Sequence, residues 1–85
     1  MENRFIMTPS YLDELVEVAI LDHELMLHKK MTFEQFVKHM NLSNPYAIKT
    51  LEIIYNIPSY EHRKIALREY LTEVIRMQLG QSNGN

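Results

Sequence analysis

The segment TFEQFVKHMNLSNPYAIKTLEIIYN, residues 32–56, decides the fold because it encodes two helices and the turn between them. Thr32, followed three residues later by Gln35, forms a capping box, in which side chains and backbone pair reciprocally at the start of a helix. Apolar residues then recur at helical spacing and predict one buried face, consisting of Phe33, Phe36, Val37 and Met40. The segment therefore predicts a short helix that starts at Thr32 and stops at Asn41.

The second half of the segment predicts a tight turn and a longer helix. Asn41 tolerates a left-handed backbone and suits the end of the preceding helix. Asn44 or Ser43 is the expected N-cap of the next helix, and Pro45 suits its first turn because that position needs no N–H. Pro58 forces the end of this helix. Its main buried arc is expected to contain Ala47, Ile48, Leu51, Ile54 and Tyr55.

Longer helices are expected on both sides of this segment. The first runs from about Pro9 to His28, with Thr8 as its N-cap or Ser10, followed by Asp13, as a competing cap two residues later. Its apolar arc comprises Leu12, Leu15, Val16, Ala19, Ile20, Met26 and Leu27. The last helix starts after Ser59 and runs to about Leu79. Its apolar face comprises Ala66, Leu67, Tyr70, Leu71, Val74, Ile75 and Met77.

No segment of the chain alternates between apolar and polar residues with period two, so we predict an all-α fold. The expected architecture is a compact four-helix domain with short connections. It occupies residues 1–79 as a single helical domain, and Gly80 serves as the stop signal of the last helix. The remainder, residues 80–85, contains no apolar residue that could dock, and we expect it to be disordered.

The composition excludes several classes of function. The chain has no cysteine, which removes disulfide scaffolds, zinc fingers and thiol catalysis. Its two glycines are Gly80 and Gly84, so the glycine-rich loops that hold phosphates or dinucleotides have no counterpart. No stretch approaches the length of a membrane span or a signal peptide. We expect a cytoplasmic protein that does not contact a membrane.

The histidines and serines do not form a pattern typical of catalysis or metal binding. His23 and His28 are five residues apart, so on one helix they point roughly 140° away from each other and cannot chelate one ion. Ser10, Ser43 and Ser59 all stand at expected helix starts, where capping explains them. We therefore expect no enzymatic activity, no catalytic residues, no metal site and no cofactor.

His23 itself lies within the apolar arc of the first helix and has two interpretations. It is either a half-buried histidine that is hydrogen-bonded to a neighbour or a carbonyl, or a pH-sensitive contact at an interface between helices or subunits.

Charge is distributed unevenly along the chain. Residues 1–27 carry one base and six acids, whereas residues 28–85 carry eight bases and five acids. This distribution suits pairing within the chain, head-to-tail association, or a partner surface of mixed sign. Strong unaided binding of nucleic acid would require more positive charge than the formal net charge of −2 at pH 7.

Two helices carry additional apolar rows that a domain of this size does not easily bury. We predict that at least one row contacts another protein or a second copy of the chain. The protein-interaction candidates are Val18, Leu21 and Leu25 on the first helix, and Tyr46, Ile53 and Ile57 on the third. The predicted function is a small regulatory interaction module, an adaptor or inhibitor of an unidentified protein partner, with a homodimer as a further expectation.

Residues 32–56 also resemble a helix-turn-helix unit. The resemblance rests on Phe36 and Met40 before the turn, Leu42 within it, Ala47 after it, and Asn41 where that family usually has glycine. It implies the alternative function, a DNA-binding transcriptional regulator. The DNA-contact candidates are Lys29, Lys30, Lys38, Asn44, Tyr46, Lys49 and Thr50. In the second helix of this unit, which is the third helix of the chain, the outward row also contains Glu52. A recognition helix typically presents basic and amide side chains to DNA.

Overall fold

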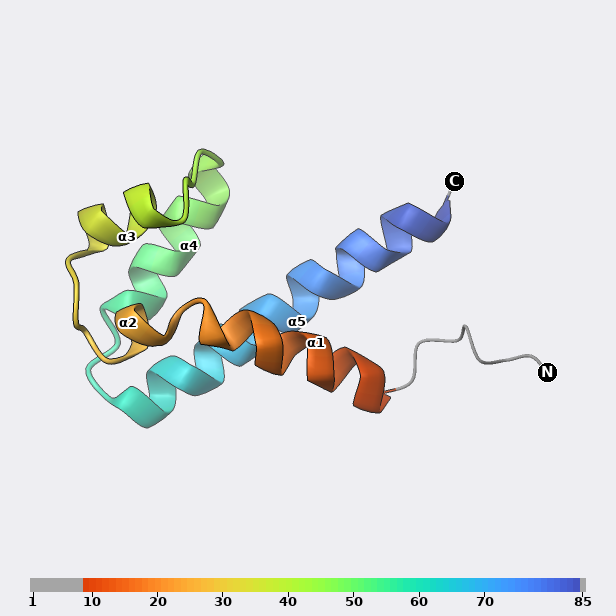
Figure 1. Cartoon of the computed structure of the whole chain (residues 1–85), viewed down its shortest axis with the longest axis horizontal. Coiled ribbons are helices and arrows are strands. Elements are labelled where there is room, and N and C mark those ends of the chain that lie inside the picture. The colour runs from red at the N-terminus through yellow and green to blue at the C-terminus, as the bar shows by residue number, and fades with distance from the viewer. Residues whose placement is uncertain (1–8, 85) are drawn as a thin grey trace.

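The computed structural model describes residues 9–84, and its side chains are described for residues 11–80. This part of the chain is all-helical and contains no strand, which confirms the predicted fold class. The helices are α1 (Pro9–Leu21), α2 (Glu24–Leu27), α3 (Phe33–His39), α4 (Pro45–Tyr55) and α5 (Tyr60–Gly84) (Figure 1).

The helix starts predicted within residues 32–56 are confirmed atom by atom. Thr32 Oγ1 accepts from the backbone N–H of Gln35 at 3.1 Å, and Gln35 Oε1 accepts from the backbone N–H of Thr32 at 3.0 Å. Asn44 Oδ1 accepts from the backbone N–H groups of Tyr46 and Ala47. These contacts satisfy N–H groups that have no partner inside the helix.

Two connections between the described helices each contain a residue with a left-handed backbone. Asn41, between α3 and α4, has a φ of 55°, as its position in the predicted turn required. Lys29, between α2 and α3, has the same φ of 55° and was not predicted, because lysine does not favour this conformation.

Ser59 Oγ accepts from the backbone N–H of His62 at the start of α5, so the predicted cap is present.

The single helix expected from Pro9 to His28 is wrong, because the chain breaks after Leu21. In a continuous α-helix the backbone N–H of His23 would donate to the carbonyl of Ala19. Here it donates to Ile20 at 2.8 Å, and Nδ1 of the His23 ring lies 3.0 Å from the Ala19 oxygen instead. The Ala19 carbonyl also accepts from the backbone N–H of Asp22 at 3.1 Å, so the last turn tightens to i→i−3 bonds, the His23 ring joins the backbone at this carbonyl, and α2 starts separately at Glu24.

The stop predicted at Gly80 is also wrong. The helical backbone of α5 continues through Gly80 to Gly84, and no described glycine adopts the positive φ of a helix-ending turn. The single domain over residues 1–79 and the disorder of residues 80–85 stay predictions. The proposed N-cap Thr8 lies outside the described residues.

The core lies where α5 meets α1, α2 and α4, while α3 packs against α4. In Figure 1, α1 lies across α5, and α3 and α4 form a second layer beside them. The buried apolar residues are Leu12, Val16, Ile20, Met26, Leu27, Phe36, Leu51, Ile54, Leu67 and Leu71. All of them except Phe36 belong to the long arcs that helical periodicity predicts for the first, third and last helices, and Phe36 belongs to the short stripe of α3.

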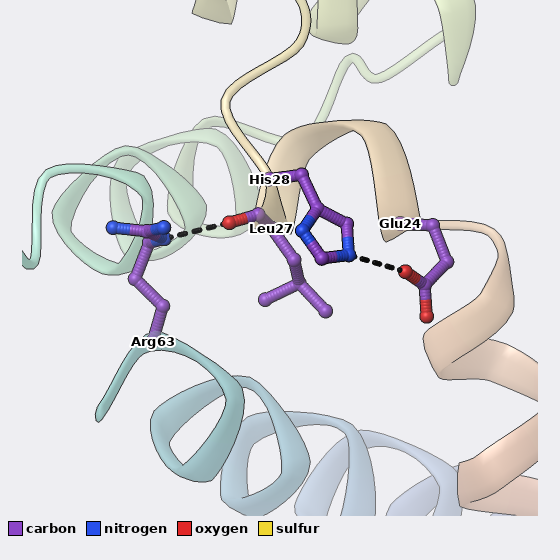
Figure 2. A network of polar contacts seen from close by, with 4 residues as sticks. All are labelled: Glu24, Leu27, His28 and Arg63. Atoms are coloured by element: carbon purple, nitrogen blue, oxygen red, sulfur yellow. Dashed lines mark hydrogen bonds and ion pairs between the residues drawn. The ribbon is translucent and has the colours of Figure 1, made fainter. Parts of the chain in front are cut away.

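Arg63 is a buried charged residue that joins three segments of the chain and that the sequence did not indicate. Its Nε donates to the Leu27 carbonyl at 2.9 Å, at the end of α2 (Figure 2). Its Nη1 donates to the carbonyls of Ile57 at 2.7 Å and Pro58 at 3.1 Å. The guanidinium therefore satisfies carbonyls that a helix end and a proline turn leave without partners. An arginine in the first turn of a helix is usually solvated, so its burial had no sequence signal.

Candidate protein-interaction surface

The α1–α2 row, defined as Val18, Leu21 and Leu25, is exposed in the folded chain. The exposed fractions of these side chains are 64%, 65% and 49%. Helix α1 directs Leu12, Val16 and Ile20 into the core against α5, so its remaining face carries the row outward. Three large apolar side chains within eight residues of chain thus remain in contact with water.

The break after Leu21 divides the α1–α2 row between two helices. Val18 and Leu21 are three residues apart on α1 and therefore share one face. Leu25 lies on α2, a single short turn in which Met26 and Leu27 are fully buried. The position of Leu25 is fixed by this anchoring of α2 in the core rather than by a continuous helix.

Acidic side chains surround the α1–α2 row. Glu14 stands one turn before Val18 on the same helix, Glu17 immediately precedes Val18, and Asp22 immediately follows Leu21; all three are exposed. Glu17 accepts a hydrogen bond from Nη1 of Arg68 on α5. Glu14 and Asp22 form no ion pair within residues 9–84. The row is therefore an apolar strip with a negatively charged margin.

The second predicted row, on α4 and the residue after it, is less uniform. Tyr46 and Ile53 have exposed fractions of 75% and 60%, but Ile57 is partly buried. Tyr46 also lines a groove of about 370 Å³ between α4 and α5, together with Tyr70, Val74 and Met77. Burial raises the pKa of the Tyr70 hydroxyl above its ordinary value, and the nearby Tyr46 adds to the effect.

The DNA-contact candidates lie on several elements. Lys29 and Lys30 precede α3, Lys38 lies on α3 and Lys49 on α4, and all four are exposed. The ammonium of Lys29 lies 5.4 Å from the ring centroid of Tyr55. Of the remaining candidates, Asn44 and Tyr46 are exposed at the start of α4 and Thr50 is partly buried. The side chain of Asn44 already binds the backbone of its own helix.

His23 is buried against the aromatic ring of Phe36, with 5.4 Å between the ring centroids. Burial lowers the pKa of His23, while its bond to the Ala19 carbonyl and the charge of Asp22 oppose that shift. The structure shows the carbonyl contact of the first interpretation, and it also places the His23 ring at a contact between helices, as the second interpretation requires. Its Nδ1 contacts a carbonyl at the end of α1.

Other kinds of site find no support in the described residues. Within residues 9–84, no group of three or more histidine, aspartate or glutamate side chains gathers as metal ligands would. None of the described helices is both long and apolar enough to cross a membrane. The chain matches no protein-family model, and comparisons with curated proteins and with solved structures find no match. The functional argument therefore starts from the chemistry of the exposed surface.

Proposed function

We propose that the protein is a small regulatory interaction module, an adaptor or inhibitor that binds a protein partner through exposed apolar residues on its helices. The exposure of the α1–α2 row carries this proposal. Complete burial of one leucine side chain is worth about 1.5–3 kcal/mol, so covering three such side chains would supply a large driving force for association. Apolar centres of this kind, with polar or charged rims, are typical of protein interfaces.

The α1–α2 row is the stronger of the two predicted rows. Each of its three side chains is exposed, and no structural role within the described residues explains why these positions are apolar. The row of Tyr46, Ile53 and Ile57 is less uniform, because Ile57 is partly buried. We therefore assign partner binding to Val18, Leu21 and Leu25. The cytoplasmic location and a homodimer stay predictions.

Affinity capture with matched variants tests this proposal. The immobilised wild-type protein, Leu21→Asp and Ile53→Asp would be exposed to a lysate of the source organism. The two variants place the same charge at side chains of similar exposure on different helices. We expect the same captured protein with wild type and Ile53→Asp, and its loss with Leu21→Asp. Thermal unfolding monitored by circular dichroism should give similar midpoints for all three, because neither side chain is part of the core.

If Leu21→Asp retains the captured protein and Ile53→Asp loses it, partner binding would be assigned to α4 instead. Equal capture by all three proteins would contradict the binding role of both rows.

The second candidate function is a helix-turn-helix DNA-binding regulator. Two observations support it: α3 packs against α4, and Asn41 between them has the left-handed backbone expected at that position of the turn. Against it, exposed Glu52 lies one turn after Lys49 on the outward side of α4.

DNA binding predicts a measurable salt dependence. Fluorescence anisotropy with fragments of the source genome should then give micromolar or better affinity that falls steeply with salt and is lost in Lys38→Ala or Lys49→Ala. An affinity that is unchanged in both lysine variants would exclude α3 and α4 as the DNA-binding surface.

A further inference from the structure

The charges around the α1–α2 row restrict what can bind there. Every ionisable side chain of α1 with a charge at neutral pH is acidic, namely Asp13, Glu14 and Glu17. Asp22 continues this series directly after the helix, and all four carboxylates are exposed. No lysine or arginine occurs on α1 or α2.

Only part of this acidic charge is compensated inside the chain. Glu17 pairs with Arg68, while Glu24 Oε1 lies 3.1 Å from Nε2 of His28, a hydrogen-bond contact (Figure 2). Within the described residues, Asp13, Glu14 and Asp22 form no ion pair. A partner that covers Val18 and Leu21 would therefore meet uncompensated carboxylates at the edge of the apolar strip.

This charge distribution disfavours a second copy of the chain as the partner that covers the α1–α2 row. A symmetric dimer places the same patch on both sides of the interface, so the acidic margins would face each other. Like charges opposed across an interface destabilise it and act against wrong partners. Nucleic acid and anionic membranes would be repelled for the same reason.

The backbone of α1 also restricts the form of the partner. Residues 9–84 contain no strand, so this surface offers no sheet edge to which an extended peptide could add. The apolar side chains Val18 and Leu21 follow helical spacing and match the way an amphipathic helix presents its own apolar face. An additional helix lying along α1 is thus the geometry that buries the row most completely.

We propose that the α1–α2 row binds a basic amphipathic helix, whose apolar face covers Val18, Leu21 and Leu25 and whose lysine or arginine side chains pair with Glu14 and Asp22. This inference rests on the proposed function and names the chemistry of the protein partner. Burial of the apolar strip supplies affinity, and the acidic margin selects the sign of the partner's charge.

Two synthetic peptides provide the test. Each is an amphipathic helix of roughly 18 residues, or five turns, with leucines on one face. The polar face carries lysine in one peptide and glutamate in the other. Fluorescence anisotropy should show that the lysine peptide binds about tenfold more tightly, because the exposed carboxylates attract its lysines and repel the glutamates of the other peptide. This preference should shrink between about 50 mM and 0.5 M salt, where charges are more strongly screened.

Charge reversal in the protein supplies the matched control. The double variant Glu14→Lys/Asp22→Lys should lose the preference for the lysine peptide and gain affinity for the glutamate peptide. The double variant Glu34→Lys/Glu52→Lys changes the net charge equally on α3 and α4 and should keep the original preference. Leu21→Asp should abolish binding of the lysine peptide.

Several results would overturn the inference: no binding of the lysine peptide, equal affinity for both peptides, or an equal loss of preference in the two double variants. A dimer in light scattering that Leu21→Asp dissociates would also overturn it, because a second copy would then occupy the row. If the lysine peptide fails while Leu21→Asp still loses the captured partner, the inference fails and the interaction module stands. If Leu21→Asp retains the captured partner, the proposed function itself fails.

Discussion

The guanidinium of Arg63 binds three backbone carbonyls, one at the end of α2 and two in the connection between α4 and α5. We expect Arg63→Ala to lower the free energy of unfolding by about 3 kcal/mol, because charge-assisted hydrogen bonds are lost and buried carbonyls are left without donors. Urea denaturation monitored by circular dichroism measures this change.

Arg68→Ala is the control for this prediction, since Arg68 forms an exposed ion pair with Glu17 and should cost less than about 1 kcal/mol. Equal losses in the two arginine variants would show that the Arg63 contacts do not stabilise the fold.

His23 makes the stability of the fold depend on pH. Its pKa in the folded chain is lowered from the ordinary value of 6.5 by burial, so the unfolded chain binds the proton more readily. The stabilisation is complete above pH 6.5 and is lost as pH falls from there toward the lowered pKa. We expect the midpoint of thermal unfolding to fall over this range in wild type. His23→Gln should weaken this dependence.

The matched variant for this measurement is His62→Gln, which alters an exposed histidine on α5 and should keep the wild-type profile. An unchanged pH profile in His23→Gln would assign the dependence to another group.

At the scale of elements, the turn between α3 and α4 depends on the left-handed conformation of Asn41. Asn41→Gly should leave the free energy of unfolding unchanged or raise it slightly, because glycine adopts this backbone without strain. Asn41→Val should lower it by about 1–2 kcal/mol, because a β-branched side chain clashes at positive φ. Equal stability of the two variants in urea denaturation would contradict the role of this turn.

The sequence predicted those elements whose signals are local. Thr32, Asn41 and Asn44 each act on a backbone within three residues of themselves, so their roles follow from neighbouring residue types. The break after Leu21 was not predictable in this way, because the apolar pattern continues through it to Met26 and Leu27, which are both in the core. It coincides with the contact of the His23 ring with the Ala19 carbonyl and with the packing of Phe36, from another helix, against that ring.

At the scale of the whole molecule, the helical periodicity of the apolar residues predicted the candidate surface. Once α5 covers the inward face of α1, Val18 and Leu21 must point away from the core, and their exposure followed from the helical pattern alone. Periodicity could not show that Ile57 is partly buried, since it lies beyond the end of α4, nor that Arg63 is buried. Both depend on how distant segments meet.

Photo-crosslinking from position 21 tests the central claim most directly. A benzophenone side chain would replace Leu21 in one protein and Ile53 in another, and each would be irradiated in a lysate of the source organism. We predict a covalent adduct with one other protein from position 21 and no such adduct from position 53. An adduct from position 53 alone, or none from either position, would contradict the assignment of partner binding to the α1–α2 row.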